Sequence, residues 1–223
     1  MRKLPKDCRG FTITELLVAT TVAIGFALAG WAFQRTQAKD LGDQSAMIEA
    51  AEKIRAAMGF MTREIQRAGY DPRSSAFTTA GSTGVSQAAA NRLLLQWDAD
   101  ADGALEPNAA DPSAESILYT YEATSRSIIR TVNGVSETVI DDVPVNGFSL
   151  AYYDENGTQL AYDATETITD DGGSVATPVL GAAKRDAIGY VIVRLRVTAS
   201  ATRTETLDLT SRVTLRNRIL ARL

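Results

Sequence analysis

The sequence predicts an α+β protein in which one long N-terminal helix packs on an antiparallel β-sheet. Three observations support this fold class. Residues 16–33 are almost wholly apolar, residues 47–68 carry apolar side chains at helical spacing, and several segments after residue 90 alternate between apolar and polar side chains. Helix signals at the start of a chain and strand signals through the remainder are typical of the α+β class.

The first half of the predicted helix is an apolar stretch that contains one carboxylate. Glu15 is the only ionisable side chain between Gly10 and Arg35, and two threonines are the only interruption of the run 16–33. A helix here comes close to the roughly 20 apolar residues that span a bilayer. A charge inside a bilayer costs at least about 2.5 kcal/mol by insertion scales. Glu15 is therefore predicted to be a functional residue whose positive partner comes from another molecule.

A cleaved secretory signal peptide is the plain alternative for this stretch. Such a peptide has a short apolar core followed by a cleavage site of small residues. Here the apolar run is too long, an acidic residue lies at its start, and no Ala-x-Ala sequence follows it. The segment therefore predicts a membrane anchor that stays in the protein.

The residues around Glu15 resemble the processing signal of a known family. Residues 9–17, Arg-Gly-Phe-Thr-Ile-Thr-Glu-Leu-Leu, are similar to the class III signal of type IV pilins and pseudopilins. The resemblance implies that prepilin peptidase cuts between Gly10 and Phe11 and methylates the new amino terminus at Phe11. It also implies that Glu15 approaches the amino terminus of a neighbouring subunit in a filament, because two buried groups of opposite charge are costly when unpaired.

This resemblance divides the chain into four parts. Residues 1–10 form a basic leader, residues 11–33 the transmembrane part of the helix, residues 34–70 its periplasmic half, and residues 71–223 a globular β-sheet domain of pilin-like fold. Because positive flanking charge stays on the cytoplasmic side, we expect a single-pass inner-membrane protein with a cytoplasmic N-terminus and a periplasmic C-terminal domain. After assembly the protein is expected in the pilus.

The composition argues against catalysis and against nucleic-acid binding. The chain has no histidine, and its only cysteine, Cys8, lies in the leader, so the commonest general base and nucleophile pairs are missing. Without the leader, 19 basic residues stand against 26 acidic ones. Such an acidic domain does not bind nucleic acid through a general basic patch. We expect a structural protein and not an enzyme.

Apolar side chains at alternating steps of four and three draw one stripe along the second half of the helix: Met47, Ala51, Ile54, Met58, Met61, Ile65 and Ala68. The stripe predicts a helix that lies on a sheet. Gly69 and Pro72 are expected to end this helix. Gly42 is a weak point within it, and Gly59 is expected to allow close approach to the sheet.

Strand signals follow a loop rich in Ser, Thr, Ala and Gly that reaches to about residue 90. The expected strands are residues 92–97, 115–122, 127–132, 135–140, 147–154, 158–162, 191–197 and 207–215. Asn133-Gly134 and Asn156-Gly157 predict tight hairpin turns, and residues 163–187 read as a polar loop. The last two strands alternate clearly, which gives each one buried and one solvated face. We expect about six or seven of these segments to pair in one antiparallel sheet.

Three later segments narrow the resemblance within the family. Residues 61–70, 149–157 and 209–217 are similar to minor pilins of the PilW type and compatible with the larger type II secretion pseudopilins of the GspJ type. The resemblance implies a subunit near the filament tip that primes assembly and contacts other major and minor pilins through its N-terminal helix. Major pilins commonly close a C-terminal loop with a disulfide, which the mature chain lacks the cysteines to form.

One acidic loop suggests a possible cofactor, calcium. Asp98, Asp100 and Asp102 alternate before Gly103, which matches the first half of a calcium loop. Position twelve is Ala109 instead of a bidentate Glu, although other acids substitute for it by a different path: Glu106, Asp111 or Glu115. A solvated acidic turn remains the open alternative. The calcium interpretation defines a rival from another class, a membrane-tethered calcium-dependent binding module.

Overall fold

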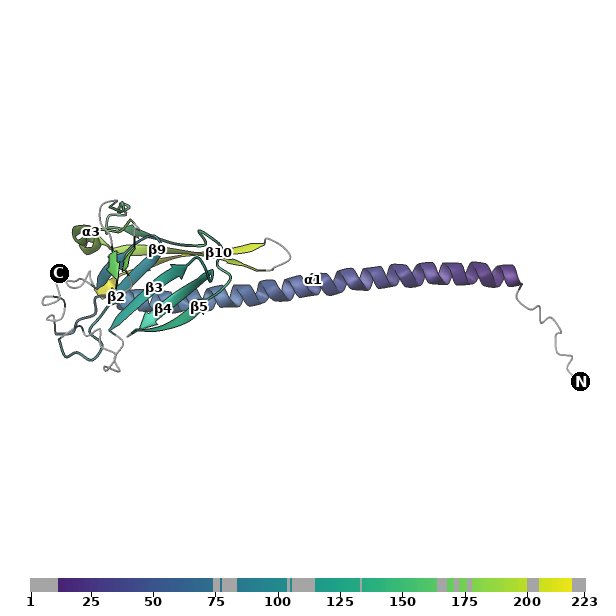
Figure 1. Cartoon of the computed structure of the whole chain (residues 1–223), viewed down its shortest axis with the longest axis horizontal. Coiled ribbons are helices and arrows are strands. Elements are labelled where there is room, and N and C mark those ends of the chain that lie inside the picture. The colour runs from purple at the N-terminus through teal and green to yellow at the C-terminus, as the bar shows by residue number, and fades with distance from the viewer. Residues whose placement is uncertain are drawn as a thin grey trace, which may run out of the picture. The chain divides into compact units, whose positions relative to one another are not determined.

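A computed structural model of the chain describes residues 12–73, 77, 84–103, 105, 115–132, 134–163, 168–170, 173–175, 178–199 and 205–217. The chain consists of two compact units, Met1–Ala46 and Met47–Leu223. Helix α1, Ile13–Arg67, contributes to both units (Figure 1). The strands belong to the second unit.

The first unit contains the apolar part of α1. Its large apolar side chains are exposed, among them Leu16, Leu17, Phe26 and Trp31. Within the described part of the chain, α1 is the helix long and apolar enough to cross a membrane. The helix continues through Gly42, so the expected weak point does not interrupt it.

In the second unit, the last turns of α1 bury one face, as the apolar stripe predicts. Ile54, Met58, Met61, Ile65 and Ala68 are all buried. The buried face is wider than the predicted stripe, because three further side chains turn inward: Ala50, Ala57 and Glu64. The helix ends at Arg67, and Gly69 follows with a φ of 76°, which a residue with a side chain adopts only at a cost.

The role expected of Gly59 is wrong. Gly59 lies on the exposed side of α1, and a Cβ atom added to it would meet nothing within 4 Å. Close approach of backbones instead occurs where Gly84 meets the end of the helix. A Cβ on Gly84 would lie 2.2 Å from the backbone nitrogen of Gly69.

Two antiparallel sheets form the bulk of the second unit (Figure 1). The first has five strands in chain order: β1 (Val85–Ala88), β2 (Arg92–Gln96), β3 (Ser116–Glu122), β4 (Ser127–Val132) and β5 (Val135–Ile140). The second has the order β10-β9-β6, with β6 (Phe148–Tyr153), β9 (Tyr190–Thr198) and β10 (Thr206–Thr214). A two-stranded ribbon pairs β7 (Ile168–Asp170) with β8 (Gly173–Val175).

The α+β fold class is confirmed, but the expectation of one continuous sheet is wrong. The chain leaves the first sheet between β5 and β6. Asp142 and Asn146 there have φ values of 58° and 61°, and Pro144 between them has no N–H for a ladder. These three residues turn the chain away, so β6 pairs with β9 instead of β5.

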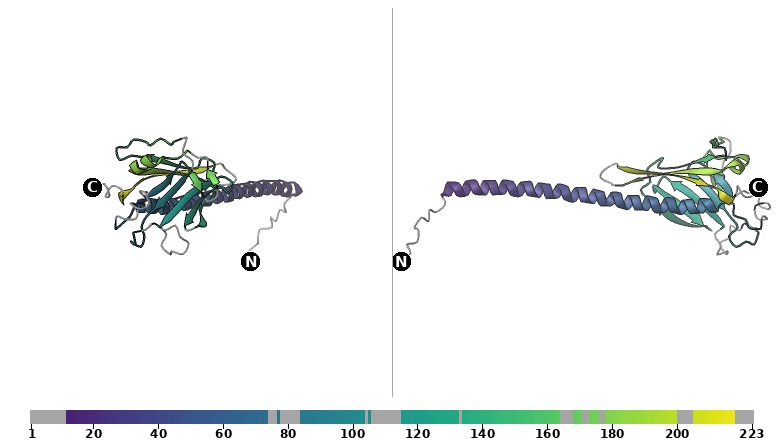
Figure 2. Two further views of the ribbon diagram at one scale, coloured as in Figure 1. Left: turned by 60° about the vertical axis from the view of Figure 1, so that its left-hand side comes forward. Right: turned by 180° about the vertical axis from the view of Figure 1, so that it is seen from behind.

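A single hydrophobic core joins α1 to both sheets. Met61 and Ile65 of α1, Leu93 of β2, Tyr119 of β3 and Leu195 of β9 are fully buried in it. The view from behind shows the last part of α1 lying across a face of the five-stranded sheet (Figure 2). This packing fixes which side chains of the helix face the strands.

The remaining differences from the expected strands are local. The first hairpin is confirmed, since β4 and β5 pair from Val132 and Val135, although Asn133 lies outside the described residues. The expected strand 158–162 is reduced to an isolated bridge between Gln159 and Tyr153. Strand β1 lies in the expected loop before residue 90, and the polar segment 163–187 contains α3 (Ala182–Ala187).

Candidate functional site

Glu15 lies in the first turn of α1 and closes a capping box with Thr12. The Thr12 backbone N–H donates to Glu15 Oε2 at 2.9 Å, and the Thr12 hydroxyl donates to the same oxygen at 2.8 Å. In return, the Glu15 backbone N–H donates to Thr12 Oγ1 at 3.3 Å. This reciprocal arrangement satisfies donors that a helix start otherwise leaves open. The predicted processing residues Gly10 and Phe11 lie outside the described residues.

This capping role was missed in the sequence, although Thr-x-x-Glu ahead of an apolar run is its signature. It gives Glu15 a partner on its own helix, where the negative charge is also favoured by the helix dipole. The surroundings of the carboxylate remain apolar, since Leu16, Leu17 and Val18 are all exposed. Glu15 therefore lies on a surface that lipid or another protein is expected to cover.

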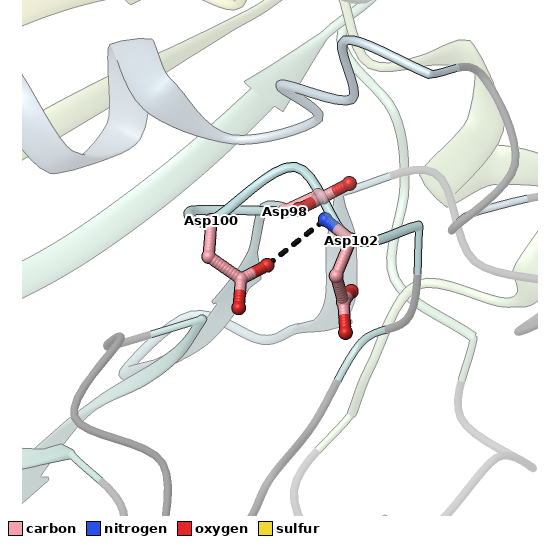
Figure 3. A group of neighbouring side chains, drawn as sticks. All are labelled: Asp98, Asp100 and Asp102. Atoms are coloured by element: carbon pink, nitrogen blue, oxygen red, sulfur yellow. Dashed lines mark hydrogen bonds between the residues drawn. The ribbon is translucent and has the colours of Figure 1, made fainter.

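The three predicted calcium ligands lie close together in the loop after β2 (Figure 3). One carboxylate oxygen from each of Asp98, Asp100 and Asp102 lies within 4.8 Å of the others. Asp98 is buried, whereas Asp100 and Asp102 are exposed. Gly103 adopts a φ of 89°, which agrees with the sharp turn expected there.

Backbone N–H groups already occupy much of this carboxylate cluster. The two oxygens of Asp98 accept hydrogen bonds from Ala101 at 2.7 Å and from Gly103 at 3.1 Å. Asp100 accepts one from the backbone of Asp102 at 3.0 Å. These hydrogen bonds stabilise the loop as in Asx turns, so the carboxylates have a structural role that does not require an ion.

The acids that the sequence offered as a replacement for the twelfth position give no further ligand among the described residues. Glu115 is buried, and its Oε1 accepts the Ala99 N–H at 2.9 Å, so it supports the loop backbone. Glu106 and Asp111 lie outside the described residues. Calcium binding at Asp98, Asp100 and Asp102 stays a prediction.

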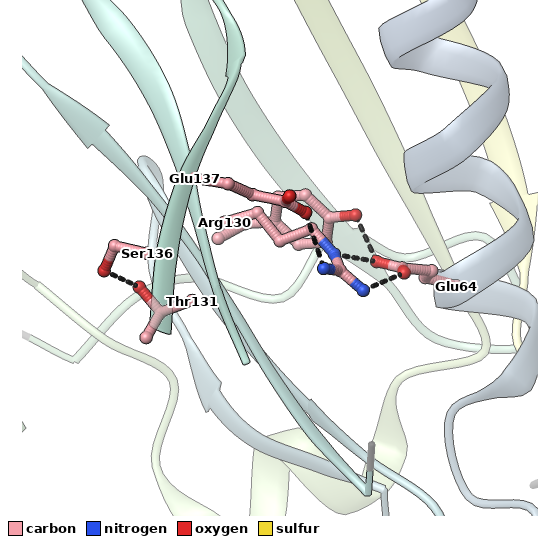
Figure 4. Close-up of polar contacts among 6 residues, drawn as sticks. Glu64, Arg130, Thr131, Ser136 and Glu137 are labelled. Carbon is pink, nitrogen blue, oxygen red and sulfur yellow. Dashed lines mark hydrogen bonds and ion pairs between the residues drawn. The ribbon is translucent and has the colours of Figure 1, made fainter. Parts of the chain in front are cut away.

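A buried ionic cluster between helix and sheet was not predicted. Glu64 of α1 is only 7% exposed, and its carboxylate accepts hydrogen bonds from Arg130 at 2.8 and 3.3 Å and from the Tyr119 hydroxyl. Figure 4 shows Arg130 between Glu64 on the helix and Glu137 on β5, which lies 2.7 Å from it. The sequence signal that could have revealed this cluster was an acidic residue directly before Ile65, beside the apolar stripe of the helix.

The role of this cluster is to position the helix on the sheet. Burial, followed by the bond to Glu64, raises the pKa of Tyr119 well above its usual value, so the phenol stays protonated and donates. Arg130 is charged at all relevant pH values. The cluster therefore holds one turn of α1 against β3 and β4.

An exposed apolar helix that begins with one carboxylate and continues into an antiparallel α+β domain defines a protein of the type IV pilin class. Residues 43–216 match the family model for prepilin peptidase-dependent protein B (PpdB). The chain belongs to this family, which has a pilin-type role that depends on prepilin peptidase. No curated protein and no solved structure matches the chain.

The family match is independent of the residues that first suggested it. The matched region begins at residue 43, after the predicted cleavage signal and after the apolar part of α1. Two separate parts of the chain thus indicate the same class: the N-terminal signal by its residues, and the globular domain by its family.

Proposed function

We propose that the chain is a minor pilin that primes assembly of a type IV pilus from a position near its tip. Prepilin peptidase cleaves between Gly10 and Phe11 and methylates Phe11. Residues 11–33 then hold the protein in the inner membrane, with its C-terminal domain in the periplasm. Glu15 guides its incorporation beside other major and minor pilins.

The observation that carries this proposal is the carboxylate of Glu15 at the head of an exposed apolar helix. Its bonds to Thr12 keep it satisfied in the isolated chain. The charged amino terminus of a neighbouring subunit offers a stronger partner, because it carries a full positive charge, whereas the Thr12 donors are neutral, and opposite charges attract strongly where water is excluded. When the Glu15 carboxylate exchanges the Thr12 donors for this amine, the pairing favours one axial position of a subunit relative to its neighbour.

The first experiment determines the mature terminus. The protein is isolated from membranes of cells with and without prepilin peptidase and analysed by intact mass and N-terminal sequencing. We expect a chain that begins with N-methylated Phe11 only where the peptidase is present. A terminus at Met1 in both strains, or cleavage beyond Phe33, contradicts the proposal.

A type II secretion pseudopilin of the GspJ type is the alternative within the class. Loss of the gene product is expected to reduce surface pili and leave type II secretion intact. The opposite pattern indicates a pseudopilin. The mature chain has no cysteine, which favours a minor subunit over a disulfide-closed shaft subunit in either filament.

The membrane-tethered calcium-dependent module is separated from both by Glu15→Ala. A simple tether inserts at least as well without this charge, whereas a filament subunit loses incorporation. A Glu15→Ala protein that still inserts, is processed and fails to co-purify with pili supports the minor pilin. Unchanged function together with a calcium requirement supports the tethered module.

A further inference from the structure

An open groove of about 690 Å³ lies beside the end of α1 in the second unit. Its walls include Arg63 and Arg67 of α1, Tyr70 just after the helix, and Trp97 after β2. We infer that this groove binds an acidic peptide segment of a neighbouring subunit. The inference takes the identity of that neighbour from the proposed pilin function.

The groove is assembled from segments distant in sequence. Asn217, which follows β10, donates its side-chain amide to the backbone carbonyls of Gln66 at 3.3 Å and Arg67 at 3.2 Å. These bonds fasten the segment after β10 to the end of the helix. Arg216 is thereby held in the wall of the same groove as Arg63 and Arg67.

The positive charge of the groove is not compensated within the described part of the chain. Arg63, Arg67 and Arg216 are exposed, and among the described residues no carboxylate forms an ion pair with any of them. Glu64 also lines the groove, but Arg130 and Tyr119 engage its carboxylate. A chain of net charge −4 therefore has a local cationic site.

The helix dipole alone does not account for this cluster. It favours cations in the last turn of α1, where Arg67 lies. Arg216 belongs to a different segment, and its presence in the same wall is a separate observation. Three arginines that converge from two segments indicate an anionic ligand.

The aromatic lining narrows the ligand to a peptide. Tyr70 is 47% exposed, whereas Trp97 is only 5% exposed and belongs to the groove wall, so it is mainly the Tyr70 ring that offers aromatic surface in the same groove as the guanidinium groups. Guanidinium binds carboxylate through two parallel hydrogen bonds, and arginine and aromatic residues are enriched at protein interfaces. An acidic side chain next to an apolar one matches both features.

A nucleic acid matches the groove less well. A phosphate backbone binds along an extended line of cations. Ala99 lines one part of the groove, and the exposed carboxylates of Asp100 and Asp102 follow it in sequence. These charges repel a polyanion that extends from the groove past Ala99, and they do not line the groove itself.

The test uses the full chain in detergent and a fluorescein-labelled octapeptide of glutamates with one central phenylalanine. A peptide with glutamine in place of glutamate is the control ligand. Fluorescence anisotropy is expected to show binding of the glutamate peptide alone, and binding is expected to weaken with added salt because exposed charges are screened. The joint replacement Arg63→Gln, Arg67→Gln and Arg216→Gln is expected to weaken binding by about tenfold or more.

Arg55→Gln is the matched control variant. Arg55 is also an exposed arginine on α1, but it lies outside this groove, so its replacement is expected to leave binding unchanged. Circular dichroism verifies that the triple variant is folded. A glutamate peptide that fails to bind, that binds no better than the glutamine peptide, or that binds the triple variant equally overturns the inference.

A single-stranded thymidine oligonucleotide completes the experiment. Tighter binding of the oligonucleotide than of the glutamate peptide, lost in the triple variant, overturns the peptide assignment and indicates nucleic acid. These readouts do not depend on cleavage at Gly10 or on filament assembly. A groove that does not bind the peptide and a chain that is not a minor pilin are therefore distinguishable results.

Discussion

At the scale of single residues, Glu64 shows how an acid is accommodated in the apolar face of α1. Arg130 donates two hydrogen bonds to it and Tyr119 a third. Arg130 in turn contacts Glu137 at 2.7 Å and lies 5.0 Å from the centre of the Phe60 ring. Hydrogen bonds form only within a narrow range of distances and angles, whereas apolar side chains can pack in several arrangements. These bonds therefore define the rotation of α1 on the sheet more sharply than apolar packing alone does.

Glu64→Ala is expected to destabilise the globular domain by about 3 kcal/mol, because it leaves a largely buried guanidinium and a phenol without their acceptor. Arg130 has a side chain only 15% exposed. Glu137→Ala, whose side chain is 58% exposed, is the matched control and is expected to cost less than about 1 kcal/mol. Urea denaturation followed by tryptophan fluorescence measures both. Equal costs contradict the positioning role.

Asp98→Ala tests the acidic loop in the same way. Asp98 is fully buried, and its loss leaves the N–H groups of Ala101 and Gly103 without their acceptor. We expect a loss of about 2 kcal/mol in the free energy of unfolding, and a smaller loss for the exposed Asp100→Ala. A calcium titration of the thermal midpoint accompanies the comparison. A rise with calcium that Asp100→Ala abolishes supports the predicted ion, and an unchanged midpoint contradicts it.

At the scale of elements, the strands predicted most accurately are those whose pattern is set by local sequence alone. The bounds of β4 and β5 agree with the expected ones, because the Asn-Gly turn fixes the register of the strands on both sides. In β9, Val191, Val193 and Leu195 are buried, which follows from alternation alone. These features are local, and local sequence determines them.

The missed elements depend on contacts that the sequence does not display. Strand β1 has a register shift between Val85 and Gln87, which breaks its alternation, and its pairing with β2 holds it in place. After the turn at Gly157, backbone hydrogen bonds join Asp154 to Thr158 and Leu160 to Tyr152, but the pairing stops there. Further along, the Tyr162 hydroxyl donates to the backbone carbonyl of Leu150. The capping box of Glu15 and the partners of Glu64 likewise needed the structure, since their spacing has several interpretations.

The pairing of β9 with β10 predicts a pH dependence of stability. Hydrogen bonds from Arg196 and then Arg194 lower the pKa of Asp208, with contacts of 2.6 and 3.1 Å. A lowered pKa in the folded state means that the stabilisation is present above the unfolded value of about 3.9 and is lost as the pH falls through the folded value.

The measurement is the thermal midpoint between pH 7 and pH 2.5 for the native chain and for Asp208→Asn. The variant is expected to be slightly less stable at pH 7 and to lose less stability on acidification. The side chain of Asp208 is 38% exposed, so solvent screens the effect and the difference is small. Parallel pH curves contradict the assignment. Glu52→Gln, on the exposed side of α1, is the control.

At the scale of the whole molecule, the division into two units coincides with a division of roles. Every described residue of the main hydrophobic core, and every side chain packed against it, is numbered 47 or higher. The family match begins at residue 43, close to the boundary after Ala46. The sequence predicted the first unit from its composition and the second from its periodicity, because the apolar side chains of the first are exposed and those of the second pack in a core.

This division predicts that the globular domain folds without the first 46 residues. A chain that starts at Met47 keeps the buried residues of α1, both sheets, the Glu64 cluster and the arginine groove, and it loses the exposed apolar surface that requires lipid or protein. We expect it to be soluble without detergent and to unfold in one cooperative transition. Glu64→Ala is expected to cost it about the same 3 kcal/mol as in the full chain, since distant sites act additively. An aggregated product, a transition without cooperativity, or a much smaller cost of Glu64→Ala means that the first unit also supports the fold.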